Sequence, residues 1–120
     1  MRLERLIRFS ECIGKLKSTK RSGWVSHAGI TETESVADHS FRRAILAMCI
    51  GDLMNADTER LIRMLLLHDV QEALTGDYDS FAKEKMGMSK VKLRERTAVK
   101  RVLSTLPADL KKRYVSLWEE

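Results

Sequence analysis

Histidines and carboxylates recur inside two otherwise apolar segments of this 120-residue chain. Asp38-His39 lies in the first segment, and His68-Asp69 closes the second, followed by Glu72. Burying imidazoles and carboxylates costs free energy unless a bound partner replaces their lost hydration. A divalent transition-metal ion binds both types of group. A lone inward histidine is normally a hydrogen-bonded core residue. Because two such pairs occur together, we predict a metal site that involves both of them.

Helical spacing decides which of these side chains can meet. Glu72 follows His68 by four residues and Asp69 by three, so a continuous helix would place all three on one side. His39 shares a helix face with apolar residues and is expected to point inward. Arg43 lies about 40° around the helix from His39 and could reach the same pocket, but we do not assign it to the site. The alternative is that His68 is protonated and stabilised by the dipole at the C-terminal end of a helix, while Asp69 faces solvent.

The elements that must position these residues are predicted to be helices, because their apolar residues recur at helical spacing. Ser35 and Asp38 have the spacing of a capping box, and Asp57 or Thr58 is expected to cap the third helix. That third helix is apolar nearly all round, which predicts that it is the central, buried one. We expect helices over about 3–17, 35–54, 59–74, 89–106 and 107–120, a loop at 20–33, and a polar segment at 75–87 with a short turn near Phe81.

Composition limits the class of protein. The net charge of +5 and the pI of 9.4 suit an anionic partner, either a small phosphorylated substrate or nucleic acid. No apolar run approaches the ~20 residues of a membrane span, and the first residues do not form a secretory leader, so we expect a cytoplasmic protein with no membrane partner. Cys12 and Cys49 lack CxxC spacing and are expected to be free thiols. No repeat or linker divides the chain, so residues 1–120 are expected to form one domain.

Four separated motifs occur in order: KRSGWV at 20–25, ESVADHS at 34–40, HDVQEA at 68–73 and TGD at 75–77. Together they resemble the HD-domain 5'-deoxynucleotidases, and the similarity extends over essentially the whole chain. The resemblance implies an all-α HD-domain bundle of about five helices. It also implies a homodimer that removes the 5'-phosphate from deoxynucleoside 5'-monophosphates.

The resemblance assigns roles residue by residue. It implies that His39, His68 and Asp69 bind a divalent transition metal such as Co²⁺ or Mn²⁺. Glu72 would act on the nucleophilic water, and Asp77 would lie near the sugar or the water. These are the side-chain types that metal-assisted hydrolysis requires.

Two further residues are implied to contact the substrate. Arg21 has the planar, forked guanidinium that suits phosphate, and Trp24 offers a flat surface for a base. The family supplies a further aspartate ligand from a helix beyond Glu120. We therefore expect the chain written here to be a fragment without this last helix. The alternatives are that water or another chain fills the ligand position, or that the protein binds the metal weakly.

Two other functions compete with the hydrolase. One is a regulatory domain that binds a metal and a nucleotide without cleaving it. The other is a basic helical module for nucleic acid, since lysines and arginines crowd residues 90–113. Glu95 and Asp109 interrupt that cluster, and no helix-turn-helix pattern occurs there, so we expect a solvated charged face and no nucleic-acid partner.

Overall fold

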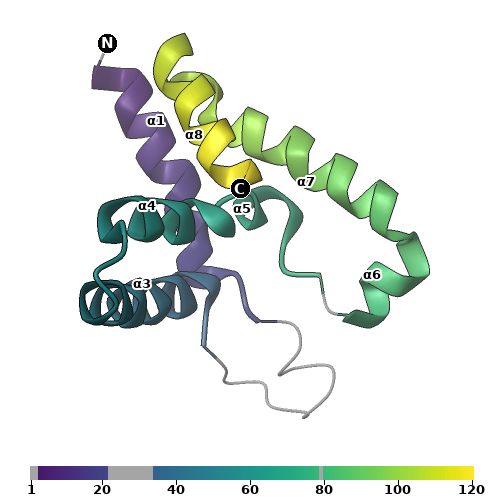
Figure 1. The fold of residues 1–120 in the computed structure, drawn as a ribbon. Coiled ribbons are helices and arrows are strands. Elements are labelled where there is room, and N and C mark those ends of the chain that lie inside the picture. The colour runs from purple at the N-terminus through teal and green to yellow at the C-terminus, as the bar shows by residue number, and fades with distance from the viewer. Residues whose placement is uncertain (1–2, 22–33, 79) are drawn as a thin grey trace.

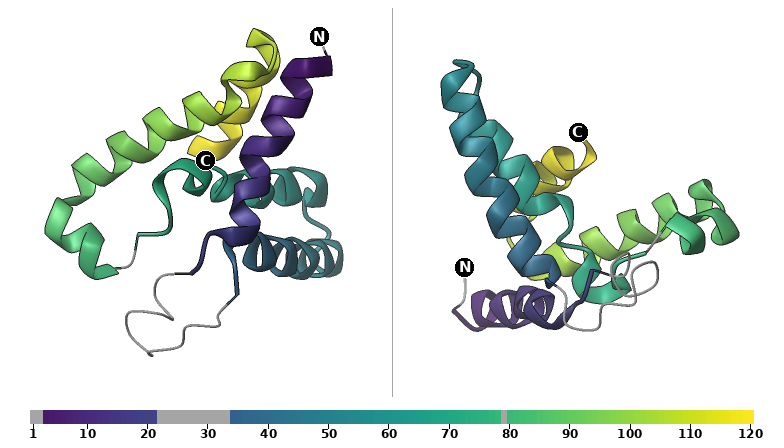
Figure 2. Two further views of the ribbon diagram at one scale, coloured as in Figure 1. Left: turned by 180° about the vertical axis from the view of Figure 1, so that it is seen from behind. Right: turned by 90° about the horizontal axis from the view of Figure 1, so that it is seen from below.

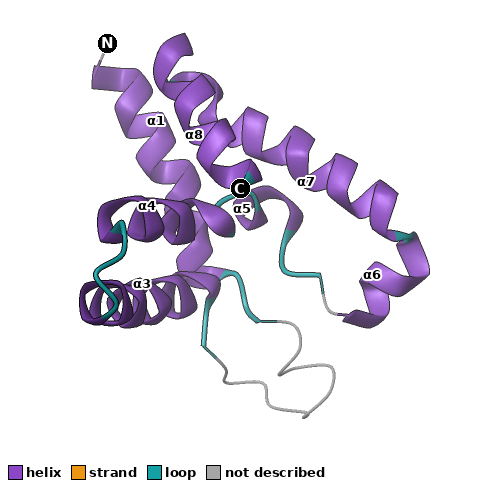
Figure 3. Ribbon diagram, viewed as in Figure 1, coloured by secondary structure: helices purple, strands orange, loops and turns teal. Residues whose placement is uncertain are grey.

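The computed structural model describes residues 3–21, 34–78 and 80–120, and its architecture is all-α as predicted (Figures 1 and 3). The helices are α1 (Leu3–Gly14), η1 (a 3-10 turn, Lys15–Ser18), α3 (Val36–Leu53), α4 (Thr58–His68), α5 (Glu72–Thr75), α6 (Ser80–Met86), α7 (Met88–Val102), η2 (a 3-10 turn, Leu103–Thr105) and α8 (Ala108–Glu119).

Two predictions of secondary structure were wrong. The helix expected over 59–74 is broken, because α4 ends at His68 and α5 begins at Glu72. The polar segment after it contains α6, where only a short turn was expected. Gly76 ends α5 with a φ of 72°, a left-handed conformation that glycine adopts without steric cost.

The core lies beside α4 and not along it. Its buried cluster joins the turn after α4 to the end of α7 and to η2, with α1 and α8 packed around it; its members are Val70, Val99, Val102, Leu103 and Leu106. No residue of α4 is fully buried, and 51% of Leu66 is exposed. The prediction that this helix is central and buried was therefore wrong. Its apolar residues are shared between contacts with α3 and α8, and the rest of its surface faces outward.

The helices form two groups that are joined by contacts of α4 with α8 and of α3 with η1. α3 and α4 lie side by side on one flank, and α7 extends away from them with α6 at its far end (Figures 1 and 2). α1 and α8 lie against α7 and η2. α5 follows the end of α4 and packs on α7, so the turn between α4 and α5 connects the two groups. No helix in the described ranges is both long and apolar enough to cross a membrane.

The outer face of α3 is apolar but uncovered. Phe41, Ile45 and Leu53 are all exposed and project away from the buried residues of this helix, which face α4 and η1. A helix that is apolar nearly all round normally packs on more than one side. This face of α3 therefore has the composition of a contact surface.

Candidate functional site

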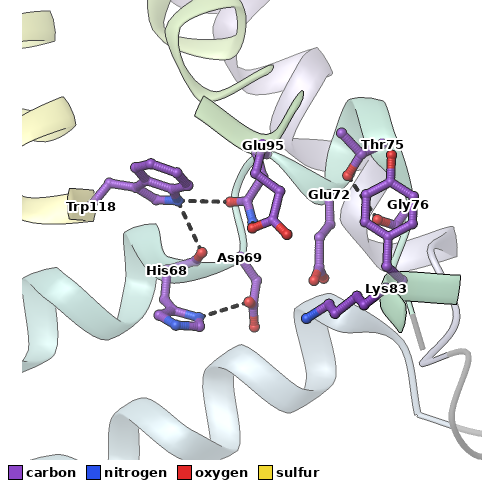
Figure 4. Close-up of a pocket in the computed structure, with 10 residues that line it drawn as sticks. His68, Asp69, Glu72, Thr75, Gly76, Lys83, Glu95 and Trp118 are labelled. Carbon is purple, nitrogen blue, oxygen red and sulfur yellow. Dashed lines mark hydrogen bonds and ion pairs between the residues drawn. The ribbon is translucent and has the colours of Figure 1, made fainter. Parts of the chain in front are cut away.

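A sharp turn between α4 and α5 carries three of the predicted site residues. Asp69 caps the C-terminal end of α4 directly after His68, and Glu72 is the first residue of α5. The turn is closed by backbone hydrogen bonds from Val70 to Leu67 and from Glu72 to Asp69. The side chain of Val70 packs into the core. The carboxylates of Asp69 and Glu72 point in a common direction (Figure 4).

Asp69 is the most enclosed acid of this turn. The residue is 8% exposed, so the alternative in which it faces solvent was wrong. Its Oδ1 lies 2.8 Å from Nδ1 of His68, and its Oδ2 accepts a hydrogen bond of 3.0 Å from Arg43. Burial opposes ionisation of Asp69, but the hydrogen bond and charge of His68 and the charge of Arg43 hold its pKa below the ordinary value. Both carboxylate oxygens therefore have cationic or polar partners.

His39 approaches this turn from the neighbouring helix. Its side chain is 19% exposed, and its Nδ1 lies 3.4 Å from a carboxylate oxygen of Glu34. Burial, followed by the charges of Arg21 and Arg43, lowers the pKa of His39, which favours the neutral imidazole that metal ions bind. His39 and Asp69 each influence the pKa of the other, so α3 and α4 bring them into one electrostatic environment.

The start of α3, and with it His39, is fixed by the predicted capping box. The hydroxyl of Ser35 accepts from the backbone N–H of Asp38, and the carboxylate of Asp38 accepts from the backbone N–H of Ser35, both at 3.0 Å. Those hydrogen bonds hold the pKa of Asp38 below its ordinary value. Lys20 pairs with Ser35 in an isolated β-bridge, which ties the chain before the 22–33 segment to this cap.

Ser35→Ala should lower the free energy of unfolding by about 1 kcal/mol, because the variant removes the side-chain acceptor of the cap. Thermal or urea unfolding followed by circular dichroism measures the change. Ser104→Ala is the matched control, since Ser104 is exposed and its hydroxyl donates to a local carbonyl. Equal stability of the two variants would show that the cap contributes nothing.

Glu72 and Asp77 form an acidic pair next to the turn. Burial, the charges of Asp69 and Asp77, and a hydrogen bond with Asp77 raise the pKa of Glu72 to about 9. The charge of Arg21 acts in the opposite direction, which shows that this predicted phosphate ligand lies within electrostatic range of Glu72. Trp24, the other predicted substrate contact, lies outside the described residues.

A cavity of about 110 Å³ opens beside these groups, lined by the turn, α6, α7 and α8. Lys83 of α6 directs its amino group toward Glu72 (Figure 4). Lys83 was not predicted, because residues 75–87 were expected to form a polar segment. Arg43 was not assigned to the site either, although its helical angle from His39 was the signal that could have identified it.

A polar network supports the back of the turn. The indole N–H of Trp118 donates to the backbone carbonyl of His68 at 3.1 Å and to Oε1 of Gln71 at 2.9 Å. The amide of Gln71 donates in turn to Glu95 at 3.4 Å. Gln71 is only 3% exposed, so these contacts link α7 and α8 to the turn through a buried side chain. Sequence spacing gave no signal for this network, because its members are far apart in the chain.

The donor chemistry of the site fits a divalent metal ion. Imidazoles and carboxylates are transition-metal ligands. The raised pKa of Glu72 reflects burial first and then the negative charge of Asp69 and Asp77, which a cation would offset. Within the described ranges, no three His, Cys, Asp or Glu side chains stand close enough together to hold an ion. The contacts of Asp69 with His68 and Arg43 engage the two oxygens that a metal would need. The set His39, His68 and Asp69 stays a prediction.

Comparison with known proteins gives a consistent family. A family model described as HD domain matches residues 13–120. Mouse 5'-deoxynucleotidase HDDC2 is 40% identical over 119 residues, covering 96% of this chain and 56% of that protein. The human protein of the same name is 39% identical over 96% of this chain and 54% of its own length.

The fold is shared with a solved structure as well. A conserved hypothetical protein from Pyrococcus furiosus superposes with a TM-score of 0.77 at 29% identity, over 94% of this chain and 64% of that one. The chain spans about half the length of the mouse and human relatives that it matches.

Proposed function

The chain belongs to the HD domain family, and we propose that its activity is the removal of the 5'-phosphate from deoxynucleoside 5'-monophosphates. The mouse and human relatives carry the name 5'-deoxynucleotidase, which supports this substrate class. We also propose that residues 1–120 act as a single domain of this kind.

One observation carries the proposal. Asp69 and Glu72 lie on one turn with His68, and His39 and Arg21 are within electrostatic range of these acids. An arginine near carboxylates and a neutral imidazole can bind a phosphate group next to a cation. The nearby cavity of about 110 Å³ is smaller than the roughly 300–1,000 Å³ of typical ligand sites, so it suits the phosphate end of a nucleotide better than a whole nucleotide.

His39, His68 and Asp69 would hold a divalent transition-metal ion such as Co²⁺ or Mn²⁺. When bound there, the ion would supply Lewis acidity to the phosphoryl group and lower the pKa of water. The neutral form of His39 favoured by burial is ready for such binding, whereas a protonated imidazole would first have to release its proton. Imidazole-rich sites accept several first-row ions, so the choice of ion follows its availability.

The reaction is a hydrolysis in which the oxygen of water bonds to phosphorus and the bond from phosphorus to the 5'-oxygen breaks. We assign Glu72 to orient the water and, in its ionised form, to accept the proton of that water at a carboxylate oxygen. A bound cation would favour this ionised form, because it would offset the charges of Asp69 and Asp77 that help to raise the pKa of Glu72 to about 9. The same proton can then pass to the departing 5'-oxygen of the deoxynucleoside. Arg21 binds the phosphoryl oxygens and stabilises their charge. Asp77, hydrogen-bonded to Glu72, fixes the orientation of that carboxyl group.

Phosphate release from deoxynucleoside monophosphates tests the proposal. We expect release from the full chain with added Co²⁺ or Mn²⁺, and loss of release in EDTA. Nucleotide binding without release would favour the regulatory domain instead. A salt-dependent shift of duplex DNA without release would favour the nucleic-acid module.

The uncovered face of α3 supports a further part of the proposal, that two copies of the chain associate. Phe41, Ile45 and Leu53 are exposed on this face and are of the kind that a homodimer interface buries. The +5 net charge of each chain does not favour self-association, so the apolar face would have to outweigh that repulsion.

A further inference from the structure

Arg43 is directed into the protein toward the predicted metal ligands. Its side chain is 25% exposed, and its guanidinium donates to Oδ2 of Asp69 at 3.0 Å and to the backbone carbonyl of Leu65 at 3.3 Å. Its Nε is buried and has no hydrogen-bond partner within the described part of the chain. The position of this side chain therefore depends mainly on its contact with Asp69.

The neighbouring arginine behaves differently. Arg42 is 71% exposed and forms two hydrogen bonds with the carboxylate of Glu34 at the surface. Surface pairs of this kind contribute little to stability, because water screens both charges. Arg43 instead places a charge beside a carboxylate that is 11% exposed, where the effective dielectric constant is lower and the interaction is stronger.

We propose, on the basis of the metal site proposed above, that Arg43 competes with the metal ion for the Asp69 carboxylate. The guanidinium neutralises Asp69 while the site holds no ion, and it weakens the binding of a cation there. Arg43 is thus a positioning residue that sets the metal affinity of the site.

Electrostatics gives the direction of the effect. A guanidinium cannot lose its proton in a protein, so its positive charge is present at every accessible pH and repels an incoming cation. It also occupies one of the two oxygens with which Asp69 could bind the ion, while His68 lies against the other. Removing the guanidinium frees Oδ2 and removes the repulsion, but leaves a buried carboxylate uncompensated when no ion is bound.

Two neutral variants and one charged variant test this inference. Arg43→Met and Arg43→Gln remove the charge, whereas Arg43→Lys keeps it. We expect both neutral variants to bind Co²⁺ about 10-fold or more tightly than the wild type in calorimetric titration, the scale of effect known for groups next to metal ligands. Arg43→Lys should stay near the wild-type affinity.

Thermal melting provides the second readout, and it does not require activity. In EDTA, the neutral variants should melt below the wild type, and the rise in Tm on adding Co²⁺ should be larger for them. Arg63→Met is the matched control, because Arg63 pairs with Glu59 on the exposed side of α4 and should leave Co²⁺ affinity unchanged.

Co²⁺ affinity that is equal to or weaker than that of the wild type in both neutral variants would overturn the role of Arg43 and leave the metal site standing. Absence of Co²⁺ binding in the wild type and in every variant would overturn the metal site, and this inference with it. Far-ultraviolet circular dichroism identifies any variant that fails to fold, and Arg43→Gln, which keeps hydrogen-bonding groups, is then the deciding variant.

Discussion

Glu72→Gln is expected to lower kcat for phosphate release by about 10²–10⁴-fold, because an amide cannot accept the proton of the attacking water. The substitution keeps the size of the side chain and its place at the start of α5. Co²⁺ affinity, measured by calorimetric titration, should change little, since Glu72 is not one of the predicted ligands. A steady-state assay of phosphate release in Co²⁺ gives kcat directly.

Glu59→Gln is the matched control for that variant. Glu59 is also a glutamate near the start of a helix, but its side chain is 77% exposed and pairs with Arg63 at the surface. Its loss should leave kcat within a factor of about two, as expected for a surface substitution. Undiminished turnover in Glu72→Gln would remove Glu72 from the proposed mechanism.

Asp69→Asn should have the second large effect, on metal binding. An uncharged amide is a much weaker ligand than a carboxylate, so we expect Co²⁺ affinity to fall by roughly 100-fold, with a parallel loss of phosphate release. The same change leaves the guanidinium of Arg43 without its anionic partner. The free energy of unfolding in EDTA should therefore fall by about 1–3 kcal/mol.

The two consequences of Asp69→Asn are separable. Calorimetric titration reports the loss of Co²⁺ binding, and urea unfolding in EDTA reports the loss of stability. Asp52→Asn is the control, since Asp52 is exposed at the far end of α3 and should change neither quantity. Wild-type Co²⁺ affinity in Asp69→Asn would exclude Asp69 as a ligand.

Much of the fold could be predicted from local chemistry. The capping box of Ser35 and Asp38 defined the start of α3, because both partners are three residues apart and interact within one turn. Asp57 was likewise expected to cap α4, and it does so by accepting from the N–H of Arg60. Apolar periodicity located the long helices for the same reason.

Features that depend on tertiary contacts could not be predicted in this way. The break at residues 69–71 arises because Val70 and Gln71 are buried among α7 and α8, which a helical pattern along α4 does not record. Trp118 likewise donates its indole N–H to the carbonyl of His68 from 50 residues away, a contact that no local pattern indicates.

The candidate site shows the same division. Residue types and spacing identified four polar residues on apolar segments whose burial a metal ion would have to offset, namely His39, His68, Asp69 and Glu72. The partner of Asp69 was not identified, because Arg43 reaches it across 26 residues of sequence and only the packing of α3 on α4 brings them together. The position of Lys83 at the cavity could not be predicted either, because it depends on a helix where a loop was expected.

X-ray absorption at the cobalt edge of the Co²⁺-loaded chain tests the central claim most directly. We expect one ion per chain with two imidazole ligands, and loss of imidazole scattering when His39 and His68 are both replaced by alanine. An ion surrounded by oxygen ligands alone, or a spectrum that these two replacements leave unchanged, would contradict it.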